Sequence, residues 1–74
     1  MKGGVFFMLD YSPFWRTCKE KGISQYDLIN MGVGRSVMQR IRKNKNMTLY
    51  TLEHLCKLLD CTPNDIITFI KEET

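Results

Sequence analysis

A chain of 74 residues with a net charge of +3 has room for one small hydrophobic core, which excludes a second domain and an enclosed active-site cleft. With 43% hydrophobic and 26% charged residues its composition is that of a folded protein, and no apolar run approaches the roughly 18 residues of a membrane span. We therefore expect a single cytoplasmic domain without a membrane segment.

The most hydrophobic stretch extends from Val5 to Leu9, directly after two glycines. It is too short for the core of a signal peptide, and it is compatible with a short β-strand or an extended arm within residues 1–11. An isolated strand needs a partner. A homodimer in which this stretch pairs with a second copy of the chain is therefore one expectation.

Residues 12–70 predict an all-α domain of five helices, because helix-capping residues recur at short spacing with apolar residues on either side of each helix start. Ser12 is expected to cap a first helix over residues 13–21, which has proline as its first residue. Ser24 is expected to cap a second helix that ends near Met31.

Gly32 and Gly34 mark a tight turn, after which a third helix is expected over residues 35–43. A polar loop separates it from a fourth helix, capped by Thr48, with an apolar stripe at Leu52, Leu55, Cys56 and Leu59.

Thr62 and proline at position 63 predict a fifth helix that reaches about Ile70, followed by a tail of residues 71–74. The cysteines lack the even number and repeated spacing of a disulfide framework, so we expect reduced, mostly buried thiols at Cys18, Cys56 and Cys61.

Positive charge is concentrated in residues 28–52, which contain no Asp or Glu and these basic residues: Arg35, Arg40, Arg42, Lys43 and Lys45. On the third helix the apolar Val37, Met38 and Ile41 fall on one side, opposite a polar arc. Arginine and glutamine bond the edges of guanine and adenine in the major groove, and serine suits several bases. We therefore expect four residues to contact bases, namely Arg35, Ser36, Gln39 and Arg40.

A second set of polar residues lies at the start of the second helix and at the end of the third. Free backbone N–H groups at a helix start favour a phosphate oxygen, and lysines just beyond a recognition helix add affinity without sequence information. The expected phosphate contacts are Ser24, Gln25, Tyr26, Arg42, Lys43, Asn44 and Lys45. Ser24 also fits the simpler role of a helix cap.

Other functions have weaker support. A basic helix face is often merely solvated, Phe14 and Trp15 suit a core better than a base-stacking platform, and His54 and Cys56 point to different sides of one helix, which disfavours zinc. No catalytic pair, phosphate loop or cofactor fingerprint is recognisable. We expect no enzymatic activity, metal, cofactor or small-molecule ligand.

Two stretches carry a family resemblance, GISQYDLI from Gly22 to Ile29 and GVGRSVMQRI from Gly32 to Ile41, together with residues 44–67. They resemble the Cro and phage-repressor type helix-turn-helix proteins, specifically the short XRE-like regulators of low-GC Gram-positive bacteria and their mobile elements. The resemblance covers residues 12–70 and implies a five-helix domain that places its third helix in the major groove of DNA.

By that likeness Gln25 holds a phosphate, Gln39 is peripheral, Val37 touches a thymine methyl, and the bases are faced by Arg35, Ser36 and Arg40. The chain departs from the common pattern by one residue fewer between the second and third helices and by Gly34 in place of Ser or Thr. A rotated third helix would let Gln39 replace Arg40 as a base reader.

The leading hypothesis is a sequence-specific regulator of transcription that binds double-stranded DNA, most simply as a repressor and a homodimer. The alternative is a protein-interaction module on the same fold, such as an antitoxin or anti-repressor. Salt-dependent binding to DNA distinguishes the two hypotheses.

Overall fold

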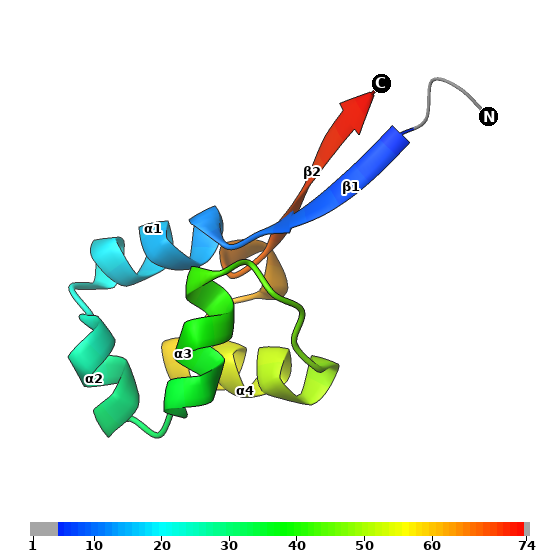
Figure 1. The fold of residues 1–74 in the computed structure, drawn as a ribbon. Helices are drawn as coiled ribbons and strands as arrows, with labels where there is room; N and C mark the ends of the chain where they lie inside the picture. The colour runs from blue at the N-terminus through cyan, green and yellow to red at the C-terminus, as the bar shows by residue number, and fades with distance from the viewer. Residues whose placement is uncertain (1–4, 74) are drawn as a thin grey trace.

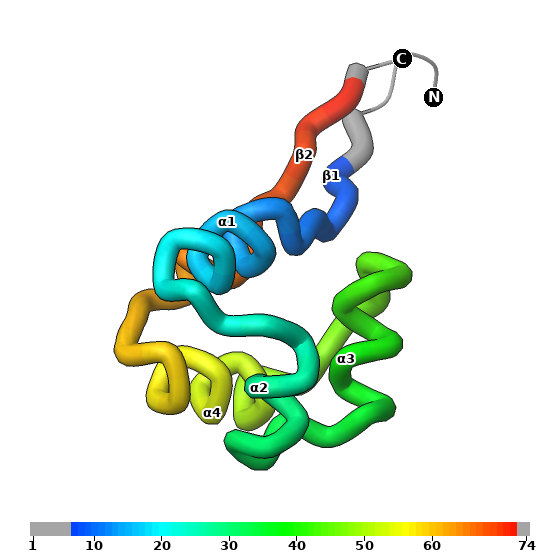
Figure 2. Tube along the Cα trace, turned by 90° about the vertical axis from the view of Figure 1, so that its left-hand side faces the viewer, coloured from blue at the N-terminus to red at the C-terminus, as the bar shows by residue number. Residues whose placement is uncertain are grey.

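The computed structural model describes residues 5–73, which form four α-helices, one 3-10 turn and a two-stranded antiparallel sheet (Figure 1). In chain order the elements are β1 (Val5–Asp10), α1 (Ser12–Lys21), α2 (Gln25–Asn30), α3 (Arg35–Arg42), α4 (Leu49–Leu59), η1 (Pro63–Asp65) and β2 (Thr68–Glu73). The helices form one body, α3 lies along one side of it, and the hairpin of β1 and β2 stands off from it (Figures 1 and 2). No helix in this part of the chain is long and apolar enough to cross a membrane.

The expected fifth helix is wrong beyond its first turn. Asp65 does accept a hydrogen bond from the backbone N–H of Thr62 at 3.2 Å, as in a helix start. The chain leaves the turn at Ile66, however, and β2 begins at Thr68. The residues after the turn are β-branched and aromatic, which favours a strand once a partner strand is present.

That partner is β1, whose expected strand conformation is confirmed. The two strands pair within one chain, with Leu9 opposite Phe69 and Met8 opposite Ile70, so the partner of β1 here is β2 and not a second copy. The pairing joins residues from the two ends of the sequence, and no local pattern in either segment identifies the other.

The starts of α2 and α4 are as predicted. Ser24 Oγ accepts a hydrogen bond from the N–H of Asp27 at 3.0 Å, and the Asp27 carboxylate accepts one from the N–H of Ser24 at 2.9 Å. These bonds hold the pKa of Asp27 below its usual range. Thr48 caps α4 through the N–H of Thr51 at 3.1 Å.

The start of α1 differs from the prediction by one residue. Ser12 is the first helical residue and its side chain makes no cap, since the capping position belongs to Tyr11. The N–H of Ser12 is instead satisfied by the Asp10 carboxylate at 3.1 Å. The helix ends at Gly22, which has the positive φ of 68° that glycine adopts at little cost.

One core holds the helices, the 3-10 turn and the base of the hairpin together. Its buried apolar residues are Tyr11, Phe14, Cys18, Leu28, Val33, Met38, Ile41, Leu52, Leu55, Leu59 and Ile66. Phe14 is fully buried and packs edge-on against the half-buried ring of Trp15, with 5.0 Å between the two ring centroids. The predicted core role of both residues is therefore confirmed. Of the cysteines, Cys18 is buried, whereas Cys56 and Cys61 are only half-buried.

The backbone conformation of the turn between α2 and α3 can be tested by substituting its two glycines. Gly32 has a φ of 109°, which an L side chain rarely adopts, whereas Gly34 has an ordinary φ of −65°. We expect Gly32→Ala to lower the free energy of unfolding by about 1–3 kcal/mol through backbone strain. Gly34→Ser supplies a helix cap and should raise that free energy by a few tenths of a kcal/mol. Urea unfolding measures both, and equal effects of the two variants would contradict this turn geometry.

Candidate nucleic-acid interface

The segment from α2 to α3 is a helix, a tight turn and a second helix. The N–H of Gly32 donates to the carbonyl of Ile29 at 3.1 Å, and the N–H of Val33 donates to that of Leu28 at 3.0 Å. These bonds satisfy carbonyl groups at the C-terminal end of α2. Val33, which follows in the turn that leads to α3, is buried. A helix, a short turn containing glycine and a second helix is the arrangement of DNA-binding helix-turn-helix motifs.

The rotation of α3 about its axis is fixed by its buried side. Met38 and Ile41 are fully buried and Val37 is half-buried. The opposite side is therefore solvent-facing, and all four expected base-contacting residues are exposed, namely Arg35, Ser36, Gln39 and Arg40. Rotating α3 so that this face turned inward would take Met38 and Ile41 out of the core, because the two sides of a helix move together.

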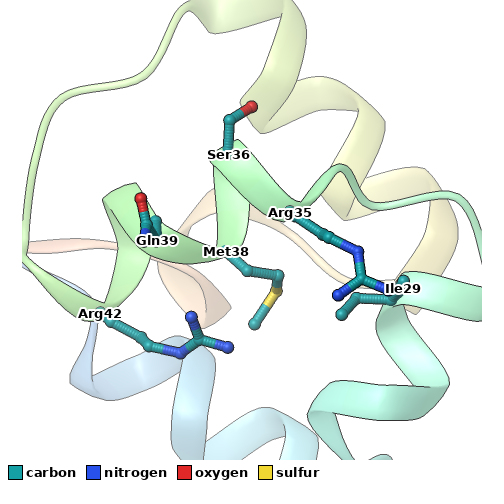
Figure 3. A pocket seen from close by; sticks show the side chains of 6 residues that line it. All are labelled: Ile29, Arg35, Ser36, Met38, Gln39 and Arg42. Atoms are coloured by element: carbon teal, nitrogen blue, oxygen red, sulfur yellow. The ribbon is translucent and has the colours of Figure 1, made fainter.

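The four residues do not point the same way. Arg35 extends toward Ile29 of α2 and Arg42 extends on the same side of α3, whereas Ser36 and Gln39 project to another side of that helix (Figure 3). The Arg35 side chain ends beside Ile29, and one hollow is lined by all four of these side chains together with Ile29 and Met38. Ser36 and Gln39 are thus exposed along α3, with Arg35 at its N-terminal end.

Arg40 lies on the other flank of α3, with Val37 and the loop that leads to α4. Its Nε donates to the carbonyl oxygen of Asn46 at 2.7 Å. This bond uses one of the five N–H donors of the guanidinium and leaves the two terminal nitrogens, which suffice for an end-on bidentate contact to a guanine. Gln39 and Arg40 are therefore both accessible, and both stay candidates for base contact.

Gln25 and Arg42 form one unit across the two helices. Gln25 Oε1 accepts hydrogen bonds from Arg42 Nε at 2.9 Å and from Arg42 Nη2. Since the amide oxygen is occupied, the amide NH₂ of Gln25 and the remaining guanidinium N–H groups are the groups left to bond an external acceptor. A donor set of this kind, next to the N-terminus of α2, suits a phosphate oxygen.

The remaining residues expected at phosphates are placed differently from one another. Lys43 and Lys45 are exposed after the end of α3, and Tyr26 is 72% exposed on α2. The Ser24 hydroxyl already caps α2. The Asn44 side chain also has a structural partner, since its Oδ1 accepts a hydrogen bond from the N–H of Tyr11 at 3.3 Å.

The structural role of Tyr11 could not be predicted from the sequence. Its hydroxyl donates to the carbonyl oxygen of Lys45 at 2.6 Å, and its N–H bonds Asn44, a residue 33 positions away. The two bonds hold the loop after α3 against the junction between β1 and α1. The local signal was limited to a large aromatic residue between an apolar run and a helix start, which indicates burial but not the partner.

Possible metal ligands and thiol groups are also present within residues 5–73. No three His, Cys, Asp or Glu side chains within residues 5–73 gather closely enough to hold a metal ion. Burial, with smaller contributions from Cys56 and Asp65, raises the pKa of Cys61 to about 11, and burial also raises the pKa values of Cys18 and Cys56. These thiols are therefore protonated at neutral pH, unlike reactive cysteines.

Comparisons with known proteins agree with this geometry. The profile of the Cro/C1-type helix-turn-helix DNA-binding domain matches residues 14–72. Among solved structures, the chain is similar to the crystal structure of transcriptional regulator VanUg, with a TM-score of 0.80 and 26% sequence identity over 97% of this chain and 93% of that chain. A comparison with curated protein sequences finds no significant match.

Proposed function

The chain belongs to the family of Cro/C1-type helix-turn-helix DNA-binding domains, and from that premise we propose that it regulates transcription by binding specific double-stranded DNA sequences. In this proposal α3 enters the major groove, and base edges are contacted by Arg35, Ser36, Gln39 and Arg40. The similarity to a transcriptional regulator over nearly the whole length of both chains supports the regulatory role.

One observation carries the proposal most directly. α3 is anchored by buried Met38 and Ile41, so its exposed side presents the donors and acceptors that base edges require, on a helix of the right width for the major groove. The first turn of α3 contains no acidic residue, and Arg40 and Arg42 lie in its last turn. The helix can therefore approach DNA without repulsion between like charges.

Phosphate contacts on both sides would fix the position of α3 in the groove. We assign one set to the Gln25–Arg42 unit beside the start of α2 and the other to Lys43 and Lys45 beyond α3. Such contacts orient a protein on the duplex but carry little sequence information. Repression is the simplest outcome, because occupancy of an operator excludes other proteins from that DNA without any further contact.

The test is a selection from random duplex oligonucleotides, followed by affinity measurements at several salt concentrations. We expect an enriched motif and an affinity that falls steeply between low and moderate salt, as counterions are released from contacted phosphates. An unenriched pool with no binding to any duplex would overturn the proposal. It would favour the alternative of a protein-interaction module, for which the exposed apolar side chains of the hairpin are the supporting observation.

A further inference from the structure

The loop after α3, residues 43–48, folds back onto the last turn of that helix. Asn44 has a positive φ of 54°, the left-handed conformation in which asparagine is tolerated at helix ends. The N–H of Asn44 donates to the carbonyl oxygen of Ile41 at 3.2 Å, and that of Lys45 donates to the carbonyl oxygen of Arg40 at 2.8 Å. The first half of the loop is therefore a helix cap and not a free linker.

Tyr11, which lies between β1 and α1, holds the same loop through two hydrogen bonds. Its side chain is fully buried, and its hydroxyl donates to the carbonyl oxygen of Lys45 at 2.6 Å. Its N–H donates to Asn44 Oδ1 at 3.3 Å. The carbonyl group of the following residue, Asn46, accepts a hydrogen bond from Arg40 Nε at 2.7 Å. Tyr11 therefore binds the carbonyl group directly before the one that binds Arg40.

Arg40 is exposed, and an exposed arginine samples many rotamers unless a contact restrains it. The bond to Asn46 fixes Nε and with it the plane of the guanidinium, and the two terminal nitrogens are left to contact an external acceptor. Arg40 and the Tyr11 hydroxyl also interact electrostatically: burial raises the pKa of Tyr11, and the positive charge of Arg40 opposes part of that rise. The hydroxyl is therefore protonated at neutral pH and can donate to Lys45.

We propose that Tyr11 is a positioning residue for DNA binding, which presets the guanidinium of Arg40 for contact with a base by holding the loop after α3. This inference rests on the proposed function, because it concerns one of the residues assigned there to bases. A side chain that is already ordered loses less conformational freedom on binding, so its contact contributes more to affinity. Tyr11 is buried and has no surface to offer DNA, so we expect its whole effect on binding to pass through Arg40.

Hydrogen exchange of the Arg40 Nε–H, followed by NMR in the free protein, tests the positioning without DNA. Tyr11→Phe removes only the hydroxyl and should speed this exchange by roughly 3- to 10-fold, as expected when one hydrogen bond is lost. Thr17→Val is the matched control, because it also removes a buried hydroxyl that donates to a main-chain carbonyl, that of Asp65 at 2.8 Å. It should leave the Arg40 exchange rate unchanged. Equal rates in wild type and Tyr11→Phe would overturn the proposal.

A double-mutant cycle tests the same coupling on DNA, with the duplex that wild type enriches from the random pool as the probe. Tyr11→Phe should weaken binding by roughly 3- to 10-fold and Thr17→Val should change it little. In an Arg40→Ala background Tyr11→Phe should have no further effect, because the side chain that it positions is gone. Circular dichroism establishes that each variant folds.

The outcomes separate this inference from the proposed function. If wild type binds its duplex and Tyr11→Phe weakens binding by the same factor with and without Arg40, Tyr11 supports the fold alone, and the inference is overturned while the function stands. If wild type binds no duplex, the proposed function and the base contact of Arg40 are both wrong. The exchange rates would still decide whether Tyr11 holds the Arg40 guanidinium in place.

Discussion

Replacement of Arg35 by alanine is expected to weaken binding to the selected operator by roughly 10- to 100-fold, with little change in the free energy of unfolding. Arg35 is exposed at the N-terminal end of α3, the end that such motifs insert most deeply, and it makes no hydrogen bond to other described residues. Its removal would therefore cost a bidentate base contact without cost to the fold. Fluorescence anisotropy with operator and scrambled duplexes measures the effect.

Two matched variants separate base contact from charge. Arg16→Ala removes the same side chain from an exposed position on α1 and should change the affinity little. Lys45→Ala should weaken operator and scrambled DNA alike and reduce the salt slope by about 1. If Arg35→Ala affected both duplexes equally, Arg35 would be a phosphate contact, and its assignment to a base would be wrong.

Replacement of Phe14 by alanine is expected to lower the free energy of unfolding by about 3–5 kcal/mol. The ring is fully buried in α1 and packs edge-on against Trp15, so its loss leaves a cavity lined by apolar side chains. Domains of this kind have total stabilities of about 5–15 kcal/mol, so a large fraction of the variant would unfold on mild heating. Urea unfolding followed by circular dichroism measures the change.

Tyr50→Ala is the control for that experiment. Its ring is 77% exposed on α4, so its removal leaves no cavity and should change the free energy of unfolding by less than about 0.5 kcal/mol. A stability of Phe14→Ala close to that of the control would contradict the position of the ring in the core.

The structure also shows which parts of the fold were accessible from the sequence. The caps at Ser24 and Thr48, the turn at Gly32 and the core stripe of α4 all follow from interactions between residues a few positions apart. Such interactions act wherever the segment lies in the molecule, so local rules identify them. The prediction of a fifth helix was wrong because local rules have a limit: the capping signal at Thr62 predicts a turn correctly, but it does not determine how far a helix continues.

The candidate site divides in a similar way. The exposed side of α3 could be predicted, since the spacing of Val37, Met38 and Ile41 alone determines which side is buried. The bond between Gln25 and Arg42 and the bond from Arg40 to Asn46 could not, because each depends on how two segments lie against each other. These bonds decide which donors of each side chain remain for DNA.

By itself, then, the sequence determined the four helices, the turn between α2 and α3 and the polar side of α3, because local hydrogen bonds and apolar periodicity are written into short segments. Only the tertiary structure decided that residues near the two ends pair as β1 and β2, and that Tyr11 holds the loop after α3. Those contacts join residues far apart in the chain. Their free energy comes from burial and hydrogen bonding that exist only once the domain has folded.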